Sequence, residues 1–372
     1  MKNIDFNTSL LKQLYDNPNI TQREMAANLK CSLGKLNYNI KFLLKKNYLK
    51  TNINKNSKRE KKYSITEKAI NHYDFSAVVE NYKVKLFKRR KTFLIAEAGI
   101  NHNGSLSDAK RLISLAKKYN FDSVKFQKRD LNICIPEHQK NIKRETPWGT
   151  MSYLEYKKKI ELSISQYAEL KKHAEKIGIT LFVSCWDINS LKLIKKLNFE
   201  YNKIPSAMIT NLNFLNEVAK EKKKTFISTG MCLMKDIEKA VKIFKKLKCP
   251  FVLMHCVSLY PCDEDKLNLN MIITLKKRFK CEVGYSGHES SVSPSITAFF
   301  LGADYIERHI TLDRAKWGTD QSASLEDVGM ERLTTLIRKI PNTLGDGKKI
   351  FLDEEKTVSK KMRYWEYNNL IK

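Results

Sequence analysis

The sequence lacks the features that mark membrane, secreted and zinc-binding proteins. It contains no uninterrupted apolar stretch of about 18 residues, and its N-terminal stretch, MKNIDFNTSL, is largely polar, so it predicts neither a membrane-spanning helix nor a secretory signal. Its 8 cysteines include no C-x-x-C pair, which argues against structural zinc and is typical of reduced thiols. We therefore expect a cytoplasmic protein without a membrane partner.

Acidic residues are scarce relative to basic ones. The chain has 40 Asp and Glu against 69 Lys and Arg, a formal net charge of +29. The excess is densest in residues 1–91, which hold 21 basic and 7 acidic residues. This distribution favours a nucleic-acid-binding segment. Lysine, asparagine and isoleucine are abundant along the whole chain, however, as in an AT-rich genome, and that bias alone raises the pI, so charge leaves both explanations open.

A length of 372 residues fits two domains, one of which could be a barrel of about 250 residues. The change in pattern along the chain predicts a first domain at 1–75, a basic linker or helix at 76–91, a second domain at 92–350 and a C-terminal tail at 351–372.

The first domain has the pattern of a winged helix-turn-helix. Thr21 followed by Glu24 predicts a capping box at the start of one helix, and Ser32 predicts the start of the next. The inner stripe of that helix is expected at Leu36, Ile40, Leu43 and Leu44. The basic and polar stretch YLKTNINKNSKREKKYSIT then indicates a wing.

The stretch NPNITQREMAANLKCSLGKLNYNIKFLLKKNYLK resembles winged-helix regulators of the MarR type, especially those associated with exopolysaccharide loci. The resemblance implies that the segment from Ser32 to Asn39 enters the major groove of DNA and that the wing touches phosphates. The residues implied to bind DNA are Ser32, Lys35, Asn37, Tyr38, Lys58, Arg59 and Lys61. The alternative is a winged helix that docks on a protein.

From Thr92 onward, short apolar runs alternate with amphipathic helical patterns. The expected strands are 93–99, 123–127, 180–184, 201–205, 225–230, 251–256, 281–286 and 304–310. Eight strand-helix units in about 250 residues predict an α/β fold of the (β/α)8 TIM-barrel type. An open doubly wound sheet is the alternative, but no G-x-G-x-x-G follows the first strand.

Every expected strand ends in a polar or ionisable side chain, and active sites of such barrels lie at the carboxyl ends of the strands. These residues are Glu97, Lys125 with Gln127, Ser184, Lys203 with Ser206, Ser228 with Thr229, His255 with Ser258 and Tyr260, Ser286 with His288, and Glu307 with His309. A single buried His or Lys is more often a core residue, but this many at one mouth favour a functional site.

The strand-end residues divide into three chemical groups. Two lysines, Lys125 and Lys203, with the hydroxyls of Ser206, Ser228 and Ser286, suit an anionic, phosphorylated small substrate. His288 and His309 lie on neighbouring strands and could share one divalent ion. Imidazole favours manganese, iron, cobalt or zinc, and magnesium stays possible if water fills the other positions.

Three carboxylates, Glu97, Glu307 and Asp320, remain for proton transfer or for orienting substrate hydroxyls. A bound metal would polarise a carbonyl oxygen as a Lewis acid.

Several ordered motifs resemble the N-acetylneuraminate (sialic acid) synthase family over about residues 92–350. They are IAEAGINHNGSLSDAKRLISLAKKYNFDSVKFQK, ISTGM, LMHCVSLYP, GYSGHE and ADYIERHITLDRAKWGTDQSASLE. The resemblance implies a barrel enzyme that condenses phosphoenolpyruvate with an amino sugar such as N-acetylmannosamine and releases phosphate. It also implies a divalent cation, commonly Mn²⁺ with Mg²⁺ or Co²⁺ as alternatives, and a homodimer.

The resemblance assigns roles by position. Phosphoenolpyruvate would be held by Lys125, Lys203, Ser206, Ser228 and Ser286. The metal would be held by His288 and His309, while Glu97, Tyr260, Glu307 and Asp320 would hold or activate the sugar and the attacking water.

The chain departs from the family at three points. Ser258 stands where Asn is frequent and Cys185 where Thr is frequent, which indicates a different acceptor sugar. The family's antifreeze-like domain is not expected, since only a short tail follows residue 350. Two alternatives stay open: a transcriptional regulator of surface-polysaccharide genes whose barrel only senses phosphoenolpyruvate or sugar, and an enzyme whose winged helix is an assembly module.

Overall fold

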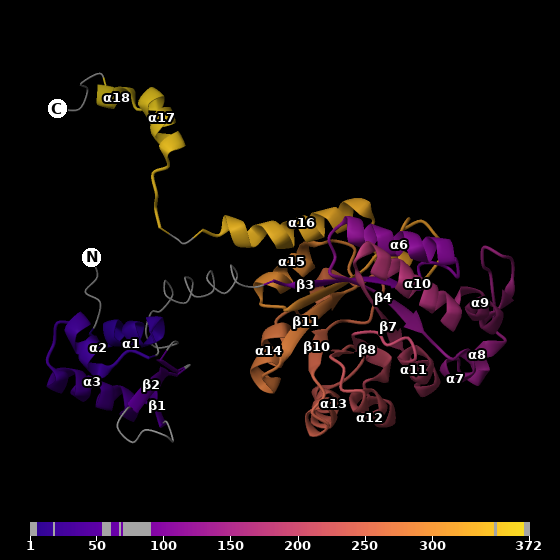
Figure 1. The fold of residues 1–372 in the computed structure, drawn as a ribbon, viewed down its shortest axis with the longest axis horizontal. Helices are drawn as coiled ribbons and strands as arrows, with labels where there is room; N and C mark the ends of the chain where they lie inside the picture. Colours follow the sequence, from indigo (N-terminus) through magenta and orange to yellow (C-terminus); the bar gives the residue numbers. More distant parts are fainter. Residues whose placement is uncertain are drawn as a thin grey trace. The chain divides into compact units, whose positions relative to one another are not determined.

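The computed structural model describes residues 6–17, 19–53, 61–66, 68–69, 91–345 and 348–367 (Figure 1). The chain divides into two compact units, one formed by Arg90–Ile340 and the other by Met1–Arg89 with Pro341–Lys372. None of the described helices is long and apolar enough to span a membrane.

The N-terminal unit contains a winged helix-turn-helix, which confirms the predicted fold. Its elements are α1 (Phe6–Asp16), α2 (Gln22–Asn28), α3 (Leu33–Lys45), β1 (Leu49–Ile53) and β2 (Lys61–Ile65), with the two strands antiparallel. Thr21 and Glu24 form the expected capping box, and Ser32 caps α3 through its hydroxyl. Leu36, Ile40 and Leu43 are buried as predicted, whereas Leu44 is only partly buried against the same core.

The second unit is a closed barrel of eight parallel strands, as predicted. The strands are β3 (Phe93–Gly99), β4 (Ser123–Lys128), β7 (Thr180–Cys185), β8 (Asn202–Ile204), β9 (Thr225–Ser228), β10 (Phe251–His255), β11 (Glu282–Gly287) and β12 (Tyr305–His309). Each lies within two residues of its expected position. The barrel closes through β12 and β3, where His309 is paired with Glu97.

Amphipathic helices surround the barrel (Figure 1). They are α6 (Leu106–Lys118), α10 (Ile164–Ile177), α11 (Ile188–Lys195), α12 (Leu212–Lys220), α13 (Met234–Lys246), α14 (Met271–Phe279), α15 (Ser293–Phe300) and α16 (Asp327–Thr343). Side-chain caps start several of them; Ser163 and Gln166 form a capping box on α10, which ends at Gly178 in a left-handed conformation.

Several short elements were not predicted. Between β4 and α10 lie α7 (Leu131–Cys134), α8 (Glu137–Lys140), the two-stranded sheet of β5 (Lys143–Arg144) and β6 (Met151–Ser152), and α9 (Tyr153–Ile160). Single 3-10 turns occur at η1 (Ser206–Met208), η2 (Glu264–Lys266) and η3 (Gln321–Ala323), and the tail contains α17 (Asp353–Met362) and α18 (Tyr364–Tyr367). The segment from α7 to α9 follows the carboxyl end of β4, so it starts at the mouth of the barrel.

Candidate active site at the barrel mouth

The carboxyl ends of the strands bring almost all predicted barrel-site residues around one cavity. Its lining consists of Glu97, Lys125, Gln127, Ser184, Trp186, Lys203, Pro205, Ser206, Ala207, Ser228, Met231, Cys256, Ser258, Tyr260, Ser286, His288, Glu307 and His309. Of the residues predicted to bind phosphoenolpyruvate, metal or sugar, Asp320 alone is not in this lining. Seven of the strands contribute side chains to this lining, and β10 contributes through the residues that follow it, such as Cys256.

A buried cluster of charges lies at the centre of the mouth. Nζ of Lys203 is 2.9 Å and 3.1 Å from the two carboxylate oxygens of Glu307, and the Ser286 hydroxyl donates to Glu307 at 3.0 Å. Nζ of Lys125 is 2.8 Å from Oε2 of Glu97 and 3.5 Å from Oε1 of Glu307. Glu307 is therefore shared between two lysines.

The pKa values in this cluster reflect burial and the unequal sharing of Glu307. Burial raises the pKa of Glu307, but Lys125 and Lys203 outweigh it and hold that pKa far below its usual range. Burial lowers the pKa of Lys125, but Glu307 and Glu97 reverse the effect and leave it raised. For Lys203, burial outweighs Glu307 and is reinforced by Lys125, so its pKa is lowered. An additional anion beside Lys203 would thus favour its charged form.

The two predicted metal ligands lie side by side with Tyr260. The ring centroids of His288 and His309 are 5.4 Å apart, and the Tyr260 ring lies 4.1 Å from that of His288. Nδ1 of His288 lies 2.6 Å from the Val257 carbonyl oxygen, so we assign the proton to Nδ1, which leaves the lone pair on Nε2. Burial and the neighbouring His309 lower the pKa of His288 to about 3, which keeps the imidazole neutral.

These two histidines fit a metal ion whose remaining ligands are water or substrate. Neutral imidazole is a metal ligand, and Nδ1 of His309 is buried without a hydrogen-bond partner among the described residues. No set of three His, Cys, Asp or Glu side chains arranged for a metal occurs in the part of the chain that the structure describes. The protein therefore offers two imidazoles, and water or substrate would have to complete the coordination.

Asp320 reaches the edge of the mouth from the loop that follows β12. Its Oδ2 is 3.6 Å from Nδ1 of His309. It also lies 3.5 Å from the position that a Cβ on Gly99 would take, and Gly99 has a φ of +51°. A side chain at Gly99 would be strained and would crowd Gln127 and Glu97, at 3.1 Å and 3.3 Å, so glycine avoids a clash with the polar ends of β3 and β4.

Gln127 fixes the orientation of Glu97. Its Nε2 donates to Oε1 of Glu97 at 2.7 Å, and its Oε1 accepts from a guanidinium nitrogen of Arg129 at 2.5 Å. The guanidinium of Arg129 stacks 3.9 Å from the ring of Trp186. Sequence reasoning missed Arg129 and Trp186, although each directly follows a strand that ends in polar side chains, which was the available signal.

Two conspicuous residues of the strand ends serve the fold. Nε2 of His255 lies 2.7 Å from the Leu267 carbonyl oxygen, and burial lowers its pKa, as in a satisfied core histidine. Arg308 points away from the barrel interior, since side chains alternate along β12. It is fully buried in an ion pair with Glu289 at 3.0 Å and donates to the Ser295 hydroxyl of α15 at 3.1 Å.

Gly230 allows a close approach at the end of β9. A Cβ at this position would lie 2.4 Å from the Ser258 hydroxyl and 2.8 Å from that of Ser206. The backbone N–H of Gly230 donates to Ser206 at 3.2 Å, which fixes this hydroxyl at the cavity wall. Ser228, Ser258 and Ser206 thereby line one side of the mouth.

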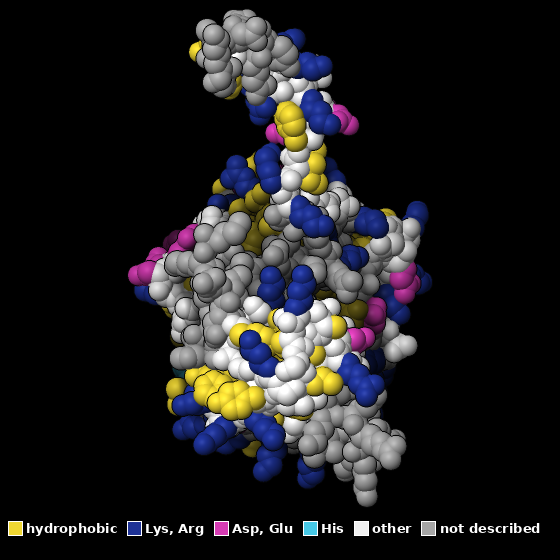
Figure 2. All heavy atoms as spheres, turned by 90° about the vertical axis from the view of Figure 1, so that its left-hand side faces the viewer, with side chains coloured by type: hydrophobic (Ala, Val, Ile, Leu, Met, Phe, Trp, Pro, Cys, Tyr) yellow, Lys and Arg dark blue, Asp and Glu magenta, His cyan; other side chains and the backbone are white. Residues whose placement is uncertain are grey.

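The structure places part of the predicted DNA-binding set on α3. Lys35 is exposed, the Tyr38 side chain is 73% exposed, and Asn37 is half-buried. The Ser32 hydroxyl is engaged in capping, since it accepts from the Lys35 N–H at 3.2 Å. In the view of Figure 2, which includes described residues of both units, Lys and Arg side chains are more prominent than Asp and Glu. Lys58 and Arg59 lie outside the described residues, as does the side chain of Lys61.

Comparison with known proteins agrees with a barrel preceded by a winged helix-turn-helix. The NeuB family model matches residues 112–349, and a model described as winged helix-turn-helix DNA-binding matches residues 7–50. The chain therefore belongs to the NeuB family.

Its relatives match the barrel. N,N'-diacetyllegionaminic acid synthase of Campylobacter jejuni is 39% identical over 276 residues, which cover 73% of this chain and 83% of the relative. N-acetylneuraminate-9-phosphate synthase of Homo sapiens is 36% identical over 275 residues, covering 73% and 76%. The N-acetylneuraminic acid synthetase structure from Leptospira borgpetersenii aligns with a TM-score of 0.63 at 32% identity, covering 75% of this chain and 92% of that one.

Proposed function

We propose that the barrel condenses phosphoenolpyruvate with the aldehyde of an N-acylated amino sugar, giving a sialic or related nonulosonic acid and phosphate. The observation that carries this proposal is the buried pair of lysines that share Glu307 beside the adjacent rings of His288 and His309 at the mouth. The names of the relatives support the same class of reaction, since each is a synthase of such an acid or of its phosphate.

The lysines and hydroxyls would bind phosphoenolpyruvate. Lys203 has a lowered pKa and shares its carboxylate with Lys125, so the phosphate or carboxylate of the substrate would supply the missing negative charge. Preorganised cations of this kind stabilise charge that develops in the transition state without reorganisation. Ser206, Ser228 and Ser286 would contribute hydrogen bonds from the cavity wall.

His288 and His309 would hold a divalent cation, for which we propose Mn²⁺, with Mg²⁺ or Co²⁺ as alternatives. When bound, such a cation supplies a Lewis acid that polarises a carbonyl oxygen. Removal of metal by a chelator should abolish turnover, and Mn²⁺ should restore it. Turnover that persists in metal-free protein would contradict this assignment.

In the proposed reaction, C3 of phosphoenolpyruvate forms a bond to the aldehyde carbon, and the aldehyde oxygen gains a proton. Water adds to C2, and the C–O bond to phosphate then breaks to leave the 2-keto acid. Glu97 is the carboxylate that we propose as proton acceptor for that water, since Gln127 orients it and it has one lysine partner among the described residues, where Glu307 has two. Glu307 is less suited because three donors occupy it and its pKa is lowered, so it would orient the lysines.

Tyr260 and Asp320 would contact the acceptor. Burial raises the pKa of Tyr260, so the phenol stays protonated and can donate a hydrogen bond to a sugar oxygen. Asp320 lies beside His309 and can accept from a sugar hydroxyl.

A phosphate-release assay with phosphoenolpyruvate, Mn²⁺ and a panel of hexosamine aldehydes tests the proposal. We expect phosphate and a 2-keto acid in equal amounts with at least one aldehyde. If no aldehyde gives phosphate, while phosphoenolpyruvate or a sugar binds and changes DNA affinity, the barrel is a sensor in a transcriptional regulator instead.

We further propose that the N-terminal domain binds DNA and that the chain acts as a homodimer in the cytoplasm. The DNA proposal is supported by the exposed Lys35 and Tyr38 on α3 and by the matching family model. DNA affinity that falls steeply with added salt would support it, whereas salt-insensitive binding to a protein would favour a docking or assembly module. Sedimentation of the full chain tests the dimer.

A further inference from the structure

The outer rim of the mouth carries two residues that the proposed reaction has not used. Arg129 directly follows β4 and Trp186 directly follows β7, and these strands are paired, with Lys128 opposite Cys185. Lys125 lies deeper, within β4. Because the proposed phosphoenolpyruvate site is at the lysines, the rim is where the second substrate would be held.

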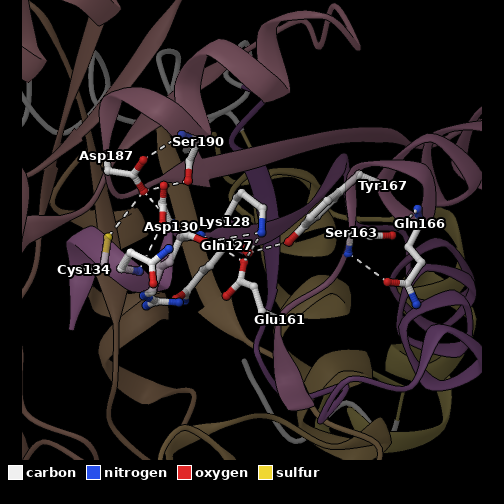
Figure 3. Close-up of polar contacts among 12 residues, drawn as sticks. Gln127, Lys128, Asp130, Cys134, Glu161, Ser163, Gln166, Tyr167, Asp187 and Ser190 are labelled. Atoms are coloured by element: carbon white, nitrogen blue, oxygen red, sulfur yellow. Dashed lines mark hydrogen bonds and ion pairs between the residues drawn. The ribbon is translucent and has the colours of Figure 1, made fainter. Parts of the chain in front are cut away.

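A dense polar network fixes the backbone on both sides of this rim (Figure 3). Glu161 accepts from Nζ of Lys128 at 2.8 Å and from the Arg129 N–H at 3.0 Å. The backbone N–H of Trp186 donates to the Lys128 carbonyl oxygen at 3.1 Å. These bonds fix the backbone from which the guanidinium of Arg129 and the indole of Trp186 project, so the stacked pair is preorganised before a ligand binds.

The same network occupies the nearby carboxylates. Asp187 accepts from the backbone N–H and the hydroxyl of Ser190, from the Asp130 N–H, and from the Cys134 thiol (Figure 3). Glu161 is likewise engaged by Lys128 and Arg129. Neither carboxylate accepts a hydrogen bond from the indole N–H of Trp186. This donor therefore remains available to a ligand.

Three buried polar atoms, each belonging to a residue that lines the cavity, have no hydrogen-bond partner among the described residues. They are Nε1 of Trp186 and the hydroxyls of Ser184 and Ser258. Ser184 is only 1% exposed. Buried donors without an acceptor are costly, and proteins normally satisfy them through a ligand or water. Nε1 can only donate, so its partner must be an oxygen acceptor.

We propose that Trp186 and Arg129 form a subsite for the N-acyl group of the acceptor sugar and thereby select N-acylated acceptors; this rests on the proposed function. The indole N–H would donate to the amide carbonyl oxygen, while the stacked guanidinium, already committed to Gln127, holds the ring in place. The neutral indole N–H suits a neutral carbonyl oxygen. An anionic group would be bound more strongly by a charged donor.

The decisive variant is Trp186→Phe, which keeps an aromatic ring for Arg129 and removes the N–H donor together with the five-membered ring of the indole; the comparison of two sugars separates the lost donor from the lost ring area. N-acetylmannosamine and mannose are the probes, since mannose carries a hydroxyl in place of the acetamide. We expect the KM for N-acetylmannosamine to rise about 10-fold, the KM for phosphoenolpyruvate to stay unchanged, and the preference over mannose to fall by the same factor. Trp148→Phe, at an exposed position outside the cavity lining, is the matched control and should change none of these values.

An equal rise in KM for both sugars, or an unchanged preference, would overturn the inference. The proposed function can fail separately: the wild type would then release no phosphate with any aldehyde. In that case, saturation-transfer NMR with N-acetylmannosamine on wild type and Trp186→Phe still decides the subsite. Weaker binding to the variant alone supports it, and equal binding or none to either protein rejects it.

Discussion

Lysine does two different things in the two units of this molecule. In the barrel mouth, Lys125 and Lys203 are each 4% exposed and are held by carboxylates at defined distances. On α3 of the winged helix, Lys35 is exposed at the surface. The interaction of a buried cation with a substrate depends on its exact position and is little screened by salt. The attraction of exposed cations to DNA depends on how many there are, and salt at 0.1 M screens it beyond about 10 Å. The loss of one lysine should therefore be severe in the barrel and mild in the winged helix.

The largest expected effect is that of Lys203→Met on turnover. The change removes one of the two cations proposed to hold phosphoenolpyruvate and leaves Glu307 with Lys125 and the Ser286 hydroxyl. We expect phosphate release to fall about 10³-fold, as for the loss of one preorganised donor. Initial rates at saturating phosphoenolpyruvate measure it.

Lys224→Met is the control for this prediction. Lys224 precedes β9 at the opposite end of the barrel, where it pairs with Glu282 at 2.6 Å. Its loss should leave turnover near the wild-type rate. Comparable losses in both variants would show that general destabilisation, not position at the mouth, causes the effect.

A fully buried cation outside the mouth should affect stability instead. Arg308→Met leaves Glu289 as a buried charge without its ion-pair partner, which costs about 3–5 kcal/mol. The expected result is a large drop in the free energy of unfolding in urea. Arg338→Met breaks a partly exposed pair with Asp122 and should cost less. Equal losses in the two variants would contradict the dependence on burial.

The sequence was sufficient to predict those parts of the barrel that depend on local pattern. Short apolar runs identified all eight strands, and polar residues at their ends identified most of the mouth, because both signals lie within a few residues. The ends of strands were less certain: β9 stops at Ser228, two residues before its expected end, since the chain turns where Gly230 meets Ser206.

What could not be predicted depends on contacts between distant segments. The stack of Arg129 on Trp186 requires the register of β4 against β7, which no local pattern contains. The elements between β4 and α10 are too short to show a helical or strand period, as the four-residue helix α7 illustrates. Alternation along a strand already places Arg308 on the face opposite to Glu307 and His309, but its contacts with Glu289 and with Ser295 of α15 could be seen only in the structure.

The buried histidine His102 should make the free energy of unfolding depend on pH, which is a smaller effect than the loss of Arg308. His102 is buried, and Nδ1 accepts from the Gly104 N–H at 3.0 Å, so the neutral ring is required. Burial lowers its pKa to about 4, below the value of 6.5 expected when unfolded. The unfolded chain therefore binds the proton first, and stability is lost as the pH falls from about 6.5 towards 4.

This single group should contribute up to about 3 kcal/mol over that range, at about 1.4 kcal/mol per pKa unit. Unfolding by urea at a series of pH values measures the slope. His102→Gln should flatten it between pH 6.5 and 4. An unchanged slope would mean that other groups cause the loss.

The smallest expected effect is that of Lys35→Ala on DNA affinity. Lys35 is exposed, and its Nζ lies over the Phe6 ring at 4.8 Å, so its removal leaves no buried charge unpaired. If Lys35 neutralises one phosphate, the slope of log affinity against log salt should decrease in magnitude by about 0.9 for every DNA sequence. If it reads a base, the loss should instead be confined to one site sequence. Phosphate release should be unchanged in both cases, because no part of the barrel mouth is altered. A loss of turnover comparable with that of Lys203→Met would remove the distinction between the two kinds of lysine.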